Sequence, residues 1–397
     1  MNELKSETSE KERLYFADWL RVLTVLSLIP YHSALTYTGL GDVYIINPLK
    51  GLGVFPFLFL TAPLDNFFMT LLFFVSGISA YHALKHRSKT EFVSERRNKL
   101  LIPLLLGFLF ICPAQAYFKA LYEGYSGSFL AFLPKFYFTE TFHYLGYAHL
   151  WFLLYLFVFS WAFAPLFVRW QKGEARYNKV ASFLLRGNNL LLPLTFIVIA
   201  ETGLRPFVDG PYIIWGDWAN DIVYAGFFLF GFVFASSPDI QAKTFKWQKT
   251  SGIIALLCAC MLIFMYYLWA VLQANSIWLS ASWAFTKGLY ECAAIIFLSG
   301  FAKKHWNKKT RLIQYLSRAS FAYYIWHYLP VSALTYLFIR TGLNGYVKYL
   351  LTVLLSYLFI FAFYEGIVKR LYPAVTNWLR REGTAGGKEE NKSSQSL

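Results

Sequence analysis

Long runs of apolar residues alternate with short polar segments along almost the whole chain, and this pattern predicts a bundle of membrane-spanning helices. A helix needs about 20 mostly apolar residues to cross a bilayer, because lipid cannot form hydrogen bonds with exposed backbone groups. The apolar stretch 52–62 is shorter, so we expect it to be re-entrant or interfacial. We therefore predict an all-α, polytopic membrane helix bundle with about ten transmembrane helices. The predicted spans are 16–38, 64–84, 100–121, 149–168, 187–204, 221–236, 251–273, 280–302, 319–339 and 347–368.

Lysine and arginine are divided unevenly between the segments that connect these spans, and the division predicts which side of the membrane each segment faces. One set of connecting segments holds 29 Lys and Arg in total, and the alternating set holds 4. Basic loops of membrane proteins stay on the cytoplasmic side, so both termini are predicted to be cytoplasmic. The basic set consists of 1–15, 85–99, 169–186, 237–250, 303–318 and 369–397.

Composition excludes several other classes of protein. Of the 397 residues, 57% are hydrophobic and only 15% are charged, whereas soluble domains carry roughly 25% charged residues. This excludes a cytosolic enzyme, a disordered protein and a disulfide-rich secreted domain. The basic loops account for the net charge of +15, so the expected partners include membrane lipids and no nucleic acid. The cysteines, Cys112, Cys258, Cys260 and Cys292, lie in apolar runs without metal-ligand spacing, so we expect buried thiols and no metal site.

The same patterns divide the chain into three segments. Residues 1–15 are predicted to form a cytoplasmic N-terminal segment, and residues 16–370 a transmembrane domain. Residues 371–397 are predicted to form a cytoplasmic tail that is partly disordered, because Gly, Lys, Glu, Asn and Ser dominate it. With no large soluble domain on either side, any chemistry must take place within the bundle or at its two faces.

The first predicted span carries ionisable residues, which are costly in lipid and therefore indicate a candidate site. Arg21 and His32 are eleven residues apart, which on an α-helix places them on one face and about 16 Å apart along the axis. Asp18 precedes Arg21 by three residues and can pair with it. Because imidazole titrates near neutral pH, His32 suits general base catalysis. The alternatives are an Arg21 that snorkels to the interface and a His32 with a purely structural role.

The second and third spans supply further candidates. Asp65 and Ser76 are also eleven residues apart and should share a face of the second span. The pair Ser76-Gly77 is alternatively a point of close helix packing. Arg96 and Arg97 are either charges that set the topology or phosphate-binding residues at the start of the third span.

The later spans also carry polar and aromatic residues. Lys287 and Glu291 lie four residues apart in the eighth span, so they can neutralise each other. The outer mouth of the fourth span and the ninth and tenth spans supply the other candidates, which are His149, Trp151, Tyr323, His327, Tyr364 and Glu365.

These motifs together make the chain similar to membrane acyltransferase family 3, the multipass O-acyltransferases of envelope glycans. Within it, Asp-Trp-Leu-Arg, Pro30-Tyr31-His32 and Tyr364-Glu365 most resemble the branch that contains glucan biosynthesis protein C. The matching motifs occur in the family's order and are Asp18-x-x-Arg21-x10-His32, Phe73 to Gly77, Arg97 with Pro103, His149-Leu-Trp-Phe, and Ser320-x-x-Tyr323 ahead of His327.

The resemblance implies an O-acyltransferase of the cell inner (plasma) membrane. An acetyl or succinyl group would move from cytoplasmic acyl-CoA, with no permanently bound cofactor, to a hydroxyl of an extracytoplasmic glycan, glucan or other envelope acceptor. His32 would act as general base or transient acyl carrier, and Asp65, Ser76 or His327 would orient it or polarise the thioester carbonyl. The other implied residues are Arg21, Arg96 and Arg97 for donor binding, with Asp18, Tyr31, His149, Trp151, Tyr323 and Glu365 in support.

Two further questions stay open at this stage. A succinyl donor would need one extra cation, for which Lys287 and Arg205 are candidates. The main rival function is a non-enzymatic transporter or flippase of a small anionic or glycan substrate, which would need no thioester donor. A sensor or scaffold is disfavoured by the shared face of Arg21 and His32.

Overall fold

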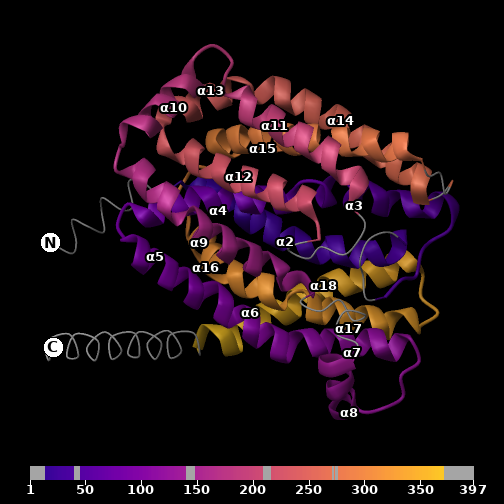
Figure 1. Ribbon diagram of the computed structural model, residues 1–397. Coiled ribbons are helices and arrows are strands. Elements are labelled where there is room, and N and C mark those ends of the chain that lie inside the picture. The colour runs from indigo at the N-terminus through magenta and orange to yellow at the C-terminus, as the bar shows by residue number, and fades with distance from the viewer. Residues whose placement is uncertain are drawn as a thin grey trace, which may run out of the picture.

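The computed structural model describes residues 14–39, 45–139, 148–208, 216–270, 272 and 276–370. Within these residues every regular element is helical, and most of the helices run along a common axis (Figure 1). The prediction of an all-α, polytopic bundle is confirmed. Most of the predicted N-terminal segment, 1–15, and the predicted tail, 371–397, lie outside the described residues.

The helices fall into two halves in chain order. The first half contains α2 (Tyr15–Thr38), α3 (Phe55–Asp65), α4 (Phe68–Leu84), α5 (Lys89–Arg96), α6 (Ile102–Leu106), α7 (Cys112–Tyr122), α8 (Phe129–Pro134), α9 (Trp151–Gln171) and α10 (Ala175–Leu185). The second half contains α11 (Leu191–Leu204), α12 (Trp218–Ser236), α13 (Pro238–Lys246), α14 (Gln248–Ala270), α15 (Ile277–His305), α16 (Arg311–Trp326), α17 (Tyr328–Ile339) and α18 (Gly345–Phe363).

Short turns of other helix types join or extend these helices. The 3₁₀ turns are Gly51–Val54, Ala148–Leu150 and Arg205–Phe207. The π-helical turns are Arg97–Leu101, Gly107–Ile111, Lys135–Thr139 and Tyr364–Val368.

Seven helical stretches of the described chain are long and apolar enough to cross a membrane. The count of ten spans and the cytoplasmic position of both termini stay predictions, as does a re-entrant role for 52–62. The seven stretches are Gly51–Leu84, Lys89–Tyr122, Ala148–Gln171, Trp218–Ser236, Gln248–Trp269, Ile277–His305 and Gly345–Val368.

Three of the predicted spans are absent from this set for identifiable reasons. The helix α2 is 24 residues long, but Asp18, Arg21 and several hydroxyl side chains lower its mean hydropathy. The helix α11 has only 14 residues. The predicted span 319–339 is not one helix, because the chain divides at His327 into α16 and α17.

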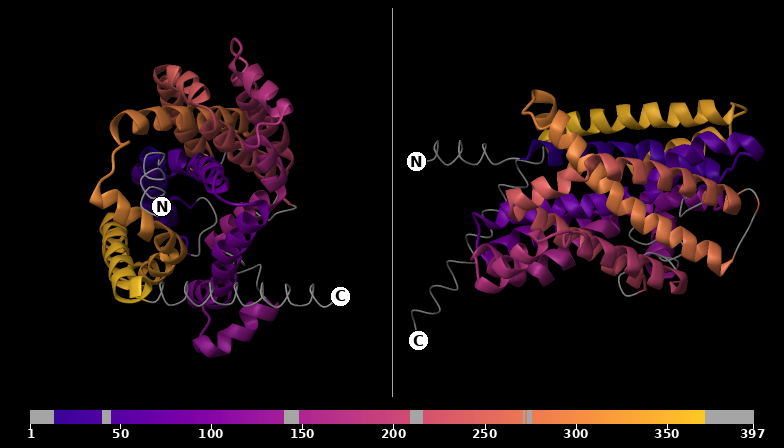
Figure 2. Two further views of the ribbon diagram at one scale, coloured as in Figure 1. Left: turned by 90° about the vertical axis from the view of Figure 1, so that its left-hand side faces the viewer. Right: turned by 90° about the horizontal axis from the view of Figure 1, so that it is seen from above.

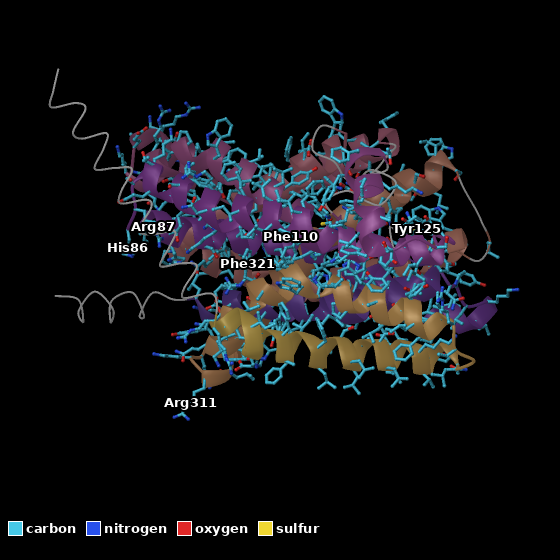
Figure 3. The ribbon with its side chains drawn as sticks, turned by 90° about the horizontal axis from the view of Figure 1, so that it is seen from below. His86, Arg87, Phe110, Tyr125, Arg311 and Phe321 are labelled. Carbon is cyan, nitrogen blue, oxygen red and sulfur yellow. The ribbon has the colours of Figure 1, made fainter. Side chains whose placement is uncertain are left out.

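The two ends of the bundle differ in charge. The short helices α5, α10 and α13, which belong to basic connecting segments, lie together at one end (Figure 1). His86, Arg87 and Arg311 lie at this end, and Tyr125 lies toward the other (Figure 3). We call the first of these the basic end; its predicted side is the cytoplasm.

The helix α2 passes through the middle of the bundle and packs against α3, α4, α15, α16, α17 and α18. Viewed along the bundle, its indigo ribbon lies among helices from both halves of the chain (Figure 2). Most side chains of α2 therefore meet another helix, and the residues Tyr15, Phe16 and Tyr31 are all buried. This central position allows Arg21 and His32 to contact residues from distant parts of the sequence.

Two glycines bring α4 and α12 into backbone contact. A Cβ atom placed on Gly77 would lie 2.0 Å from the Phe228 carbonyl oxygen, and one on Gly231 would lie 2.0 Å from the Phe74 carbonyl oxygen. Small residues allow helices in membranes to approach this closely, and dispersion contacts replace the hydrophobic drive available in water. The packing interpretation of Ser76-Gly77 is therefore confirmed for Gly77.

Two expectations from the sequence are wrong. Asp65 and Ser76 do not share a helix face, because α3 ends at Asp65 and α4 begins only at Phe68. Among the cysteines, Cys112, Cys258 and Cys292 are buried as expected, but Cys260 is exposed on the side of α14.

Candidate functional site

Three imidazole rings from distant parts of the chain meet inside the bundle. His32 comes from α2, His149 from the turn before α9, and His327 from the junction of α16 and α17. The rings of His32 and His327 stack with their centroids 5.2 Å apart, and the ring of His149 meets that of His327 edge to face at 4.7 Å. His149 and His327 are 8% and 1% exposed, so solvent does not separate the rings. We refer to these three residues as the histidine cluster.

Backbone carbonyls at the end of α16 orient two of these rings. The last carbonyls of a helix lack partners within it. His327 Nδ1 donates to the Tyr324 carbonyl at 2.7 Å, and His149 Nε2 donates to the Ile325 carbonyl at 2.9 Å. Because a carbonyl only accepts, these bonds fix the tautomer of each neutral ring. The opposite nitrogens, His327 Nε2 and His149 Nδ1, are buried and make no hydrogen bond with the described residues.

His32 is the member of the cluster that lines a pocket. Its ring is partly buried, stacks on Tyr328 at 4.4 Å, and meets the Tyr31 ring at 4.9 Å. The pocket is narrow, with free space about the size of one water molecule. A reactive group in the pocket would lie against the imidazole. The other lining residues are Thr36, Ile45, Tyr328, Val331, Ser332 and Thr335.

Asp65 is linked to His32 through Tyr31. The Tyr31 hydroxyl donates to one carboxylate oxygen of Asp65, and the Tyr266 hydroxyl donates to the other at 2.7 Å. Asp65 therefore holds the Tyr31 ring against the imidazole of His32. Sequence reasoning missed Tyr266, which lies 201 residues from Asp65, and its position within an aromatic run of α14 gives no signal.

Arg21 lies in a hydrogen-bonded group at the first turns of α2. Its guanidinium donates to Asp18 at 2.8 Å and to the Ser317 hydroxyl of α16 at 2.6 Å. Ser317 in turn donates to Asp18 at 3.1 Å. The predicted pairing of Asp18 with Arg21 is thus confirmed, and Ser317 is an added member of the group.

The other two predicted donor-binding arginines differ from each other in surroundings. The Arg96 guanidinium lies 5.0 Å from the centre of the Phe92 ring and interacts electrostatically with Arg21 and Arg87. The side chain of Arg97 is exposed, and its Nε donates to Asn98 at 3.3 Å. Arg21 and Arg96, from helices far apart in sequence, therefore combine their charges at the basic end.

Ser76 and Trp151 have no hydrogen bond or ring contact with the histidine cluster in the described part of the chain. Ser76 is partly buried on α4. The Trp151 ring instead stacks on Tyr224 with centroids 5.7 Å apart. A direct role for Ser76 at the thioester therefore has no support from the contacts that the structure provides.

Tyr323 and Glu365 belong to the basic end. The Tyr323 ring meets Tyr364 edge to face at 5.7 Å. Glu365 accepts a hydrogen bond from Tyr315 at 2.8 Å and pairs with Lys369 at 2.8 Å. The side chains of Tyr323 and Glu365 thus contact Tyr364, Tyr315 and Lys369, and no ring contact with the imidazoles is seen among the described residues.

A buried ion network lies between α11, α12 and α15, and sequence reasoning found only part of it. Lys287 pairs with Glu291 at 2.7 Å, as predicted, and also with Glu201 at 2.9 Å. Arg205 pairs with Glu201 at 2.8 Å and with Asp217 at 3.0 Å. Both candidate cations for a succinyl group are therefore already neutralised by carboxylates. The four-residue spacing of Lys287 and Glu291 predicted their pairing. Nothing in the sequence indicated the partners that other helices supply.

No group of three or more His, Cys, Asp or Glu side chains within the described ranges has a geometry that could hold a metal ion. The imidazoles of the histidine cluster also have chemistry of their own. A neutral imidazole accepts a proton or attacks an activated carbonyl, and both are steps of acyl transfer.

Comparison with known proteins identifies the family. The family model described as an acyltransferase domain matches residues 14–365, which includes every member of the histidine cluster and all three predicted donor-binding arginines. No curated protein and no solved structure matches the chain. Because the match extends over most of the 397 residues, the chain belongs to membrane acyltransferase family 3 and is an acyltransferase.

Proposed function

We propose that this acyltransferase moves an acetyl or succinyl group from cytoplasmic acyl-CoA to a hydroxyl of an extracytoplasmic glycan or other envelope acceptor. The observation that carries the proposal is the geometry of α2. It presents Arg21 at the basic end and His32 in the histidine cluster, eleven residues further along the same helix. One helix thus connects an anion-binding end with a nucleophilic centre about 16 Å away.

Donor binding is assigned to the basic end. Coenzyme A carries several phosphate charges, and guanidinium groups bind phosphates through paired, charge-assisted hydrogen bonds. Arg21 and Arg96 lie on two helices and interact electrostatically, so a polyanion that bound between them would be attracted by both guanidinium groups. Arg97 is exposed beside them and adds to the attraction. The pantetheine arm would then extend along α2 and deliver the thioester to His32.

In the first version of the mechanism, His32 acts as a general base. Its imidazole takes the proton of the acceptor hydroxyl while that oxygen attacks the thioester carbonyl carbon. The C–S bond then breaks, and the proton passes from the imidazolium to the departing thiolate. The products are an ester and free coenzyme A with a thiol, and His32 returns to its neutral form.

In the second version, the imidazole of His32 attacks the thioester carbonyl itself. The C–S bond breaks, the proton of the other ring nitrogen passes to the departing thiolate, and the acyl group is held on the attacking nitrogen. The acceptor hydroxyl oxygen then attacks the carbonyl carbon of this acyl-imidazole, the C–N bond breaks, and the hydroxyl proton returns to the ring. Detection of an acyl adduct on His32 by mass spectrometry after reaction with donor alone would select this version over the first.

The residues around His32 have separate tasks in either version. His327 stacks on His32, and its Nε2 is a buried acceptor, so it can stabilise a proton on the neighbouring ring. Tyr31, fixed by Asp65, restricts the orientation of the imidazole. The nature of the acyl group stays open between acetyl and succinyl, and assignment to the branch of glucan biosynthesis protein C stays a prediction. Neutralised Lys287 and Arg205 give no support to the succinyl choice.

The experiment that tests this function supplies radiolabelled acetyl-CoA or succinyl-CoA to membranes with an envelope glycan fraction as acceptor. Wild type should transfer label to the glycan, and His32→Ala should lower the rate at least about 100-fold, the usual contribution of a general base. His86→Ala is the matched control, because His86 is exposed at the basic end (Figure 3). Movement of unlabelled glycan without any ester formation would favour the transporter alternative.

A further inference from the structure

The short helix α10, which follows the apolar helix α9 at the basic end, has sides of different chemistry (Figure 1). At about 100° per residue, Tyr177, Ala181 and Leu184 share one side. Tyr177 is buried and the other two are half-buried, so this side packs on the bundle. Asn178 and Ser182 share a second side, which is exposed, polar and uncharged. These two sides match ordinary packing and contact with water.

The third side of α10 combines basic and apolar side chains. Arg176, Lys179, Val180 and Phe183 follow the spacing of one helix side, and all four are exposed. Val180 is 40% exposed and Phe183 is 48% exposed. The sequence of α10 contains no Asp or Glu, so no carboxylate of this helix offsets the two cations. We call these four residues the basic-apolar side.

Hydrogen bonds at its last turn fix α10 on the rest of the protein. The ammonium of Lys243, from α13, donates to the Leu185 carbonyl at 2.8 Å and to the Leu184 carbonyl at 3.4 Å. The side-chain amide of Asn189 donates to the Phe183 carbonyl at 3.0 Å. Such bonds complete a helix end, where carbonyls lack partners in the next turn. The basic-apolar side is therefore formed and oriented without any ligand.

Neither water nor the acyl-chain region of a bilayer suits this side of the helix by itself. Val180 and Phe183 are unfavourable in water, because apolar surface gains free energy when it is removed from water. Arg176 and Lys179 are unfavourable among acyl chains, where charges lose their hydration. The boundary between lipid phosphates and acyl chains suits both kinds of side chain, as it does for helices that lie in the plane of a membrane.

We infer that the basic-apolar side of α10 binds an anionic phospholipid. The lipid phosphate lies at Arg176 and Lys179, and the first part of its acyl chains lies against Val180 and Phe183. A zwitterionic lipid carries its own cation beside the phosphate, so it gains less from the two basic side chains. The inference is independent of acyl transfer, because none of these residues has a place in the donor or histidine sites.

The first test asks whether lipid contacts this side of the helix. A Cys260→Ser chain, which lacks the exposed native thiol, receives either Phe183→Cys or Ser182→Cys and is labelled with bimane. Each protein is placed in phosphatidylcholine bilayers that contain phosphatidylglycerol with a nitroxide near the top of its acyl chain. We expect stronger quenching at Phe183→Cys than at Ser182→Cys, the matched position on the polar side. Equal quenching at the two positions would contradict the inference.

The second test measures the preference for a negative headgroup. Quenching of bimane at Phe183→Cys is compared between nitroxide-labelled phosphatidylglycerol and nitroxide-labelled phosphatidylcholine. Phosphatidylglycerol should be preferred, and Arg176→Gln or Lys179→Gln should each lower this preference about fivefold, the usual contribution of one basic residue.

Arg311→Gln is the control for the second test. It removes an equally exposed cation of the basic end from a different helix, so the preference at Phe183→Cys should not change (Figure 3). The inference is overturned if both lipids quench equally in the parent chain, or if neither Arg176→Gln nor Lys179→Gln alters the preference. Neither readout requires acyl transfer, so the result stands whether or not the proposed function is correct.

Discussion

The three members of the histidine cluster differ in how firmly hydrogen bonds fix their rings. Backbone carbonyls hold His327 and His149 in one tautomer each. His32 has no such bond among the described residues, and its ring lines the pocket. A catalytic base must gain and lose a proton, so the member of the cluster with the fewest fixed bonds is the one suited to that role.

Replacement of Arg21 by lysine tests the donor-binding role at the residue scale. Arg21→Lys keeps the charge but loses the planar fork that matches phosphate geometry. We expect the KM for acetyl-CoA to rise about tenfold, within the range of a charge-assisted hydrogen bond. The assay is a titration of labelled donor in membranes. Arg311→Lys, at an exposed arginine of the same end, should leave this KM unchanged (Figure 3). An equal KM for Arg21→Lys and wild type would contradict phosphate binding by Arg21.

At the scale of elements, the junctions between helices position the site. The chain breaks at His327 between α16 and α17, and between Asp65 and Phe68 where α3 meets α4. Both breaks place a polar side chain where a continuous helix would have placed another apolar turn. The close contact between α4 and α12 fixes the position of α4, which also packs against α2.

Gly77→Ala is predicted to destabilise the bundle. The added Cβ would lie 2.0 Å from a backbone oxygen, which cannot move aside as a side chain would. We expect a loss of about 1–3 kcal/mol in the free energy of unfolding, the usual range for overpacking. The readout is the thermal unfolding midpoint in detergent. Gly203→Ala is the control, because nothing lies within 4 Å of its added Cβ. Equal midpoints for Gly77→Ala and wild type would show that α4 and α12 separate easily.

Helical spacing correctly predicted some elements and failed on others. Arg21 and His32 do share α2, because no break falls between them despite Pro30. Asp65 and Ser76 do not share a helix, because the turn at Asn66 and Phe67 lies between them and helical spacing does not apply across it. The convergence of His32, His149 and His327 depends on contacts between helices far apart in sequence. Periodicity within one segment carries no information on such contacts.

At the scale of the whole molecule, the charged end of the bundle and the pocket beside His32 lie apart. The arginines and the short amphipathic helices lie at the basic end (Figure 1), and the pocket lies on the other side of His32. In the proposed function, the imidazole is the point where donor and acceptor meet. The family match agrees with acyl transfer but does not specify either approach.

The predicted orientation can be tested with cysteine substitutions at opposite ends. Arg87→Cys lies at the basic end and Tyr125→Cys toward the other (Figure 3). In intact cells, a membrane-impermeant thiol reagent should label Tyr125→Cys and reach Arg87→Cys only after permeabilisation, because basic loops stay cytoplasmic. The unsubstituted chain is the control for its native thiols. Labelling of Arg87→Cys in intact cells would reverse the orientation, and with it the side from which donor arrives.

The junction at His327 has a consequence for how this protein can change over evolutionary time. His149 and His327 supply donors to carbonyls of the last turn of α16, so the same two side chains that flank His32 also complete a helix end. Losing either would expose a polar backbone group in an apolar interior, where lipid offers no replacement. Substitutions at these positions are therefore selected against through a loss of fold stability, even where activity is not under selection. A lineage that abandoned the chemistry would still be expected to retain these histidines, as long as it kept the broken helix.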